Sequence, residues 1–350
     1  MVVTGKKYKI TDSQRHLHEK DVATDTNLTM CDVISAGVLD YNIIDYSWSV
    51  THRCQYECDY CYAWDYIHQD ISLDYLTSWK SVVKKLSLNR SPTFNIELVG
   101  GEPTLHPELL DIVKQLTDIK KCNRVEIVTN LAKPASYYSV FDELCTDKIQ
   151  INASYHPKYH TDKFLDKCNL LSELNNVVFY VNINIMFERD MWDVTASTML
   201  YLKQHGIDYG LNLLHRTERY SGFSHNNTGD TLNNSGDTVN EFLNYVDAKY
   251  QLMPGTCIPK GLNNRAPYTT TSGDVVISEL DIRHKGLDKF YNNFTCTPTM
   301  WNISHDGVFT NACTRVKLDP LFRNITSRVT CPVETGCECD VMLLYPKVKQ

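Results

Sequence analysis

Between residues 46 and 215 the chain alternates strand-like apolar runs with segments of helical periodicity. Strand–helix units repeated in this way pair into a parallel sheet with helices outside it. Because six units occur, the sequence predicts an α/β fold on six parallel strands. Periodicity alone leaves open whether they form a partial barrel or an open doubly wound sheet. The expected strands are residues 46–50, 94–99, 124–129, 148–154, 177–185 and 208–214.

The expected helices lie between these strands. Ser72 can cap a helix over residues 73–86, whose apolar side chains recur at helical spacing. Pro107 occupies a first turn, where proline is favoured. The remaining expected helices are residues 136–145, 162–174 and 192–205.

Three cysteines follow the first expected strand at the spacing C-x3-C-x2-C: Cys54, Cys58 and Cys61. Three thiolates this close can hold one face of a [4Fe–4S] cluster, which normally takes four cysteines. One iron then stays open, as in a catalytic zinc site, and can bind a small molecule through nitrogen and oxygen. The alternative is a zinc site whose fourth ligand lies elsewhere.

A second motif, Gly100-Gly101-Glu102-Pro103, ends the apolar run of the second expected strand. The two glycines let the backbone approach a ligand closely. Glu102 supplies a carboxylate for a charge-assisted hydrogen bond to an ammonium group. Pro103 stiffens the turn. The run therefore predicts a binding site for a small cationic group.

The two motifs together resemble the radical SAM superfamily, whose signature is C-x3-C-x-aromatic-C followed by GGEP. The resemblance implies a partial (β/α)6 barrel and a cluster whose open iron chelates the amino and carboxylate groups of S-adenosylmethionine. It implies that the GGEP run receives the methionine amino group. Tyr60, at the aromatic position of the signature, is then expected to contact adenine, or to pack beside the cluster.

The chemistry of such barrels sits at the carboxyl ends of the strands. Asn130 and Ser154 end the third and fourth expected strands, and the family resemblance implies that they contact the ribose or carboxylate of the cofactor. A turn or helix-cap role is the alternative for Asn130. His156 and His160 follow closely and could serve substrate binding or proton transfer, but polar surface is the preferred interpretation for both.

The net charge and the cysteine content limit the expected partners and the expected cellular compartment. The net charge of −7 counts against a broad nucleic-acid surface, although a single nucleotide stays possible. The N-terminus lacks the apolar segment of a secretory signal, and no run is long enough to span a membrane. A cytoplasmic protein is therefore expected, in which the 13 cysteines point to metal ligands and not to disulfides.

Five cysteines crowd the C-terminal region: Cys296, Cys313, Cys331, Cys337 and Cys339. Residues 300–304 and 308–310 are strand-like and flank the turn His305-Asp306-Gly307, which predicts a β-hairpin. A hairpin brings the cysteines at its two ends together and so forms half of a metal site. The later cysteines can supply the other half.

This arrangement resembles the SPASM and twitch auxiliary domains of radical SAM enzymes. Five cysteines are too few for the two clusters of SPASM, so the one-cluster twitch form is favoured. The compressed C-x5-C-x-C ending departs from the pattern and leaves five candidates for four positions. A structural zinc ion is the alternative. The expected divisions are residues 1–45 (extension), 46–220 (barrel), 221–290 (linker) and 291–350 (auxiliary iron–sulfur domain).

The resemblance implies an enzyme that cleaves S-adenosylmethionine reductively and uses the 5′-deoxyadenosyl radical to take a hydrogen atom from its substrate. It also implies an external electron donor such as flavodoxin or ferredoxin, and an auxiliary [4Fe–4S] cluster that exchanges electrons or binds substrate. A small molecule or a peptide is the expected substrate. A nucleoside or nucleotide substrate, and a non-catalytic iron–sulfur or zinc protein, are the alternatives.

Overall fold

The computed structural model describes one long stretch of the chain and several short ones. The described residues are 33–36, 43–61, 63, 79–89, 93–160, 163–186, 188–213, 241–242, 244–246, 248–249, 265–270, 273–278, 294–296, 300–311, 317–318, 329–330 and 347–349. No helix among them is both long and apolar enough to cross a membrane.

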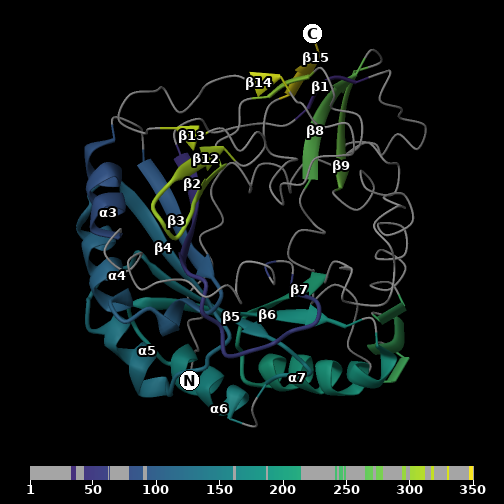
Figure 1. Cartoon of the computed structure of the whole chain (residues 1–350). Helices are drawn as coiled ribbons and strands as arrows, with labels where there is room; N and C mark the ends of the chain where they lie inside the picture. Colours follow the sequence, from purple (N-terminus) through teal and green to yellow (C-terminus); the bar gives the residue numbers. More distant parts are fainter. Residues whose placement is uncertain are drawn as a thin grey trace.

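Six parallel strands form the main part of one sheet, which Figure 1 shows along the left and lower side of the view. They pair with one another in chain order, each parallel to the next. A doubly wound sheet reverses its strand order at a switch point, and this sheet does not. The predicted α/β fold with a partial barrel is therefore confirmed. The strands are β2 (Ile43–Thr51), β3 (Thr93–Gly100), β4 (Cys122–Thr129), β5 (Ile149–Tyr155), β6 (Val177–Ile185) and β7 (Tyr209–Leu213).

Helices cover the outer face of this sheet, each lying between two consecutive strands in the chain (Figure 1). Their positions match the predicted segments, except that the first six residues of the segment 73–86 lie outside the described residues. The helices are α3 (Trp79–Leu88), α4 (Leu109–Asp118), α5 (Ala135–Asp142), α6 (Phe164–Ser172) and α7 (Trp192–Gln204), with short 3₁₀ turns η2 (Pro103–Leu105) and η3 (Arg189–Met191).

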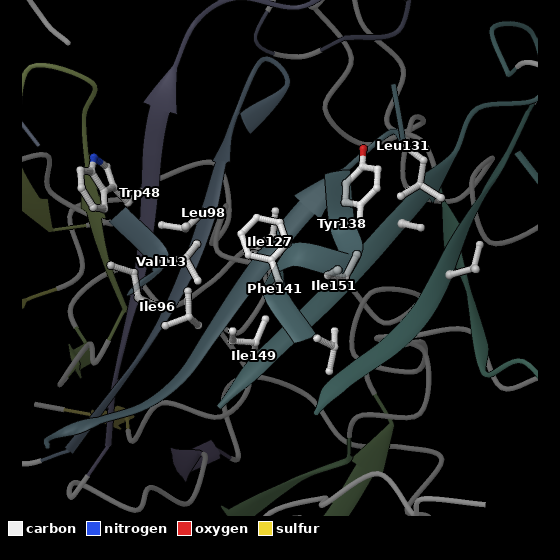
Figure 2. Packing of buried hydrophobic residues seen from close by; sticks show 14 of the residues in the cluster. Trp48, Ile96, Leu98, Val113, Ile127, Leu131, Tyr138, Phe141, Ile149 and Ile151 are labelled. Carbon is white, nitrogen blue, oxygen red and sulfur yellow. The ribbon is translucent and has the colours of Figure 1, made fainter. Parts of the chain in front are cut away.

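The core lies between the helices and the sheet. Every second residue of each strand points to the helices, and on this side the side chains are apolar, as Ile96 and Leu98 of β3 and Ile149 and Ile151 of β5 illustrate (Figure 2). Val113 of α4 packs into the same cluster. Burying a side chain of this size contributes about 1.5–3 kcal/mol, so the core holds the strand ends in fixed positions.

The predicted hairpin is present, and it joins the barrel sheet. Strand β11 (Met300–Ile303) pairs antiparallel with β12 (Phe309–Asn311), which pairs with β13 (Lys317–Leu318). Strand β11 also runs parallel to β2, with Met300 opposite Asp45. The sheet thus has nine strands, and the hairpin covers the edge of β2, which would otherwise present unpaired backbone groups.

A second sheet joins strands from both ends of the chain (Figure 1). Its order is β14-β10-β15-β1-β8-β9, and all of its pairs are antiparallel. Strands β8 and β9 fall within residues 221–290, where only a linker is expected, so part of that region is regular structure. The strands are β1 (Val33–Ala36), β8 (Arg265–Thr270), β9 (Gly273–Ser278), β10 (Phe294–Cys296), β14 (Val329–Thr330) and β15 (Lys347–Lys349).

Candidate functional site

The predicted site residues gather at the carboxyl edge of the parallel sheet. The cysteine loop follows β2, the GGEP run follows β3, Asn130 follows β4 and Ser154 lies near the end of β5. Parallel strands bring their carboxyl ends to one edge, so segments about 100 residues apart in the chain share one site.

Two backbone hydrogen bonds dock the GGEP run onto the start of the cysteine loop. The amide of Gly101 donates to the carbonyl of Thr51 (2.9 Å), and the amide of Glu102 donates to the carbonyl of Arg53 (2.7 Å). Neither glycine has room for a side chain. A Cβ on Gly100 would lie 2.1 Å from the carbonyl oxygen of Thr51, and one on Gly101 would lie 2.2 Å from that of Arg53. The glycines therefore set the separation of the two loops.

Glu102 joins this assembly to the end of β4. Its buried carboxylate accepts hydrogen bonds at Oε1 from the Thr104 amide (3.1 Å), the Thr104 hydroxyl (2.6 Å) and the Thr129 hydroxyl (2.7 Å). Its Oε2 accepts from the Asn130 amide (2.7 Å). Burial raises the pKa of the Glu102 carboxyl, and the bonds from Thr104, Asn130 and Thr129 oppose that rise. Because a carboxylate offers about four lone-pair sites, Oε2 can still accept one more bond.

We expect Thr129→Val to lower the free energy of unfolding by about 1–3 kcal/mol and to weaken S-adenosylmethionine binding, because a buried carboxylate loses a donor. Thermal or denaturant unfolding and calorimetric titration would measure both effects. Thr117→Val is the matched control: its hydroxyl bonds an exposed helix carbonyl, and a change within about 0.5 kcal/mol is expected. Equal losses in the two variants would contradict the role given to Glu102.

The three cysteines form one electrostatic group. Cys58 is buried, and Cys54 and Cys61 are partly exposed. Burial raises the pKa of Cys58 to about 12 and that of Cys54 to about 11, and the neighbouring cysteines add to both rises. A nucleophilic cysteine needs a lowered pKa, so these thiols suit metal ligation, where the metal's positive charge removes the proton.

Among the described residues, no three His, Cys, Asp or Glu side chains already converge on one point as ligands of a single ion would. The cysteine loop is consistent with a cluster site all the same. Each cysteine of a cubane cluster binds a different iron, so the sulfur atoms stand around the cluster and not around one ion.

Tyr60 and His156 pack against the cysteine loop. The rings are stacked, with centroids 5.9 Å apart and 6° between their planes. The Nδ1 atom of His156 lies 2.8 Å from the Tyr60 hydroxyl, 3.3 Å from Nδ2 of Asn184 and 3.8 Å from Sγ of Cys58. Burial lowers the pKa of His156 to about 4. His156 is thus part of the site, although the sequence favours polar surface for it.

The remaining predicted residues fall at the same edge or beyond the described part of the chain. The side-chain oxygen of Asn130 accepts a hydrogen bond from Nε2 of Gln55 (2.7 Å), so Asn130 ties the cysteine loop to β4. Pro103 is buried at the start of η2. Ser154 is partly buried and faces Asn182 in the register of β5 and β6. The metal ligands predicted near the C-terminus, Cys313, Cys331, Cys337 and Cys339, lie outside the described residues, and of Cys296 only the strand is described.

Sequence reasoning gave no hydrogen-bond partner for Thr104, Thr129 or Gln55. Thr104 lies two residues after Glu102, a spacing at which local side-chain to backbone bonds form, so it could have been found. Thr129 and Gln55 meet their partners only in the folded chain, and the sequence carries no local signal for them.

The residues present fit a [4Fe–4S] cluster with bound S-adenosylmethionine. Three thiols on one loop form the donor set. Two glycines, at which any added Cβ would clash, keep the GGEP run close to that loop. Oε2 of the buried Glu102 carboxylate keeps one acceptor position. The thiols suit the cluster, the carboxylate suits the ammonium group of the ligand, and the glycines hold the two close together.

Comparison with known proteins agrees with this geometry. The family model described as "Radical SAM superfamily" matches residues 48–208. GTP 3',8-cyclase of Pasteurella multocida (strain Pm70) is 24% identical over 159 residues, which cover 43% of this chain and 47% of that protein. S-adenosylmethionine-dependent nucleotide dehydratase of Selenomonas ruminantium is 29% identical over 110 residues, covering 29% of this chain and 38% of that protein. The chain thus matches less than half the length of these curated relatives.

Two solved structures also match, both at TM-scores below 0.5. Streptococcus suis SuiB bound to its precursor peptide SuiA gives a TM-score of 0.48 at 11% identity and covers 89% of this chain and 73% of SuiB. Native anSMEcpe with bound AdoMet gives a TM-score of 0.47 at 13% identity. It covers 86% of this chain and 80% of anSMEcpe. Radical SAM proteins use a [4Fe–4S] cluster and S-adenosylmethionine, the groups that the site fits. Residues 48–208, which are 161 of the 350 residues, are thus similar to the radical SAM superfamily.

Proposed function

We propose that this protein cleaves S-adenosylmethionine reductively and uses the resulting radical to take a hydrogen atom from a nucleotide. The observation that carries the proposal is the docking of the GGEP run on the cysteine loop through Gly101 and Glu102, with no space for larger residues. A protein that needed only a structural metal would not require a buried carboxylate with a remaining acceptor position docked against its cysteine loop.

Each residue has a role in this proposal. Cys54, Cys58 and Cys61 hold the cluster, which when bound supplies the electron that breaks a C–S bond of the ligand. When bound, the methionine portion would lie beside the GGEP run, where Oε2 of Glu102 would accept a hydrogen bond from its ammonium group.

Three further residues orient the adenosine portion. The Tyr60 ring, held by His156, packs against adenine. Asn130 and Ser154 lie at the strand ends where a ribose or carboxylate would be held. By keeping water out and the reacting carbon in place, this shell directs the radical to one C–H bond.

The nucleotide is placed ahead of the small-molecule and peptide substrates because of the named relatives. Two of them are a GTP 3',8-cyclase and an S-adenosylmethionine-dependent nucleotide dehydratase. The polar inner surface of the barrel, described below, supports the same choice. The net charge of −7 disfavours a long nucleic acid but does not disfavour a single nucleotide.

The test is anaerobic incubation of the reconstituted protein with S-adenosylmethionine, dithionite and one candidate substrate at a time. Ribonucleoside triphosphates form the main set, and short peptides and sugars form the comparison set. We expect 5′-deoxyadenosine to form faster with one nucleotide and a new nucleotide-derived product to appear by mass spectrometry. Stimulation by a peptide or sugar alone would overturn the nucleotide assignment.

We further propose that the C-terminal cysteines hold an auxiliary [4Fe–4S] cluster. Replacing Cys313 with alanine is expected to lower the iron content by about one cluster while the barrel cluster stays bound. Cys145→Ala, at an exposed thiol outside both groups, serves as the control and should leave iron unchanged. Unchanged iron with a loss of zinc in Cys313→Ala would assign a zinc site instead.

The proposed reaction consumes an electron from outside the protein. A flavodoxin or ferredoxin is the proposed donor. The cytoplasm, where thiols are kept reduced, is the proposed location.

A further inference from the structure

The face of the parallel sheet opposite the helices is polar. On β5 the residues that alternate with the core are Gln150, Asn152 and Ser154, and on β6 Tyr180, Asn182 and Asn184 occupy the corresponding positions. Parallel sheets normally carry apolar residues on both faces because both are covered. A strict polar alternation on neighbouring parallel strands therefore indicates that this face contacts something polar.

Three side-chain atoms on this face are buried and have no hydrogen-bond partner: Nε2 of Gln150, Oδ1 of Asn152 and Oδ1 of Asn182. The Gln150 and Asn152 side chains belong to residues that are only 4% and 1% exposed. Buried amide atoms almost always have partners, because an unpaired one has lost its bonds to water without replacement. Three such atoms on two adjacent strands point to a ligand that pairs with them.

The orientation of Asn152 is set by its surroundings. Its Nδ2 donates to Oε1 of Glu126 (3.0 Å), and the Tyr180 hydroxyl donates to the same oxygen (2.7 Å). Arg124 lies 3.7 Å from the other oxygen of Glu126. Reversing the Asn152 amide would set its oxygen against the carboxylate, so Oδ1 faces away from Glu126 as an acceptor. The ligand must present an N–H or O–H donor there.

The strand register brings Asn152 and Asn182 within reach of one planar ring, while Gln150 lies one step further from the carboxyl edge of the sheet. Asn152 lies opposite Tyr180, and Asn182 lies opposite Ser154. Asn152 and Asn182 are therefore diagonal neighbours, with Cα atoms about 8 Å apart. Asn184, one step nearer the sheet edge on the same face, contacts His156, which contacts Cys58. The polar atoms thus continue inward from the cysteine loop.

We propose that Asn152 and Asn182 bind the base of the nucleotide substrate; this rests on the proposed function. Two amide oxygens are the complement of a heterocycle edge that offers two neighbouring N–H donors. Among the common bases, guanine carries that set on one edge, so GTP is the first probe.

The experiment measures GTP and inorganic tripolyphosphate binding by anaerobic calorimetry on the reconstituted protein with S-adenosylmethionine. We expect wild type to bind GTP more tightly than tripolyphosphate. Asn182→Leu and Asn152→Leu should each weaken GTP binding about tenfold or more without changing tripolyphosphate binding, since only the base contact is lost. Asn182→Asp, which keeps acceptor oxygens, should restore binding to within about threefold of wild type.

Asn123→Leu, at an exposed position on β4, is the matched control and should bind both probes as wild type does. Thermal melting of each variant separates a lost contact from a lost fold. GTP binding equal in wild type and both leucine variants, or no GTP preference over tripolyphosphate in wild type, would overturn the inference. The proposed radical chemistry is tested separately, by 5′-deoxyadenosine formation in wild type without nucleotide.

Discussion

Replacing Cys58 with alanine is expected to abolish 5′-deoxyadenosine formation and to remove the barrel cluster. Cys58 is the buried member of the three-cysteine group and the one whose Sγ lies 3.8 Å from His156. A cubane cluster with only two protein thiolates is not held, so the variant should fall below about 1% of wild-type cleavage. The Cys54 and Cys61 variants should behave alike.

Cys168→Ala is the matched control. This cysteine is also buried, but it lies in α6 in the core between helix and sheet. Its removal should cost about 1 kcal/mol of unfolding free energy and leave iron content and cleavage unchanged. For both variants, iron analysis and the visible spectrum would measure cluster content, and product chromatography would measure cleavage. Retained cleavage in all three cysteine variants of the loop would contradict the cluster assignment.

We expect Gly101→Ala to lower the rate of S-adenosylmethionine cleavage by about two orders of magnitude, although all three cluster cysteines are still present. Its Cβ would lie 2.2 Å from the Arg53 carbonyl oxygen and 2.9 Å from that of His52, so the two loops must separate. The amides of Gly101 and Glu102 would then lose their bonds to the cysteine loop. A misplacement of about 1 Å at a reacting centre can cost about 10²-fold in rate.

Gly206→Ala distinguishes this effect from general backbone strain. Gly206 has a φ of +66°, which costs an alanine about 1 kcal/mol, but nothing lies within 4 Å of the added Cβ. We expect lower thermal stability with normal cleavage and S-adenosylmethionine binding. If Gly101→Ala bound and cleaved S-adenosylmethionine as well as Gly206→Ala, the docking of the two loops would not be what positions the ligand.

The regular part of the fold could be predicted because it depends on local patterns. The six strands and their helices follow from alternating and helical spacing of apolar residues. The pairing of β11 with β2 could not be predicted, because it joins residues near 300 to residues near 45 and no turn connects the two strands. The same applies to the second sheet, whose strands come from both ends of the chain.

The candidate site also has a part that the sequence predicts and a part that it does not. The three cysteines and the GGEP run are contiguous motifs, so the sequence predicts them. The bond from Thr129 to Glu102 and the packing of His156 on Tyr60 arise only when different strands meet. One local signal was available and went unused: polar residues at every second position of β5 and β6 contradict the apolar pattern usual in parallel strands.

The most direct test of the central claim is 5′-deoxyadenosine formation by the anaerobically reconstituted protein with S-adenosylmethionine and dithionite. We expect 5′-deoxyadenosine and methionine in equal amounts from wild type and neither product from Cys58→Ala. A wild-type protein that carries the barrel cluster, yet forms no 5′-deoxyadenosine with or without any of the four ribonucleoside triphosphates, would contradict the claim.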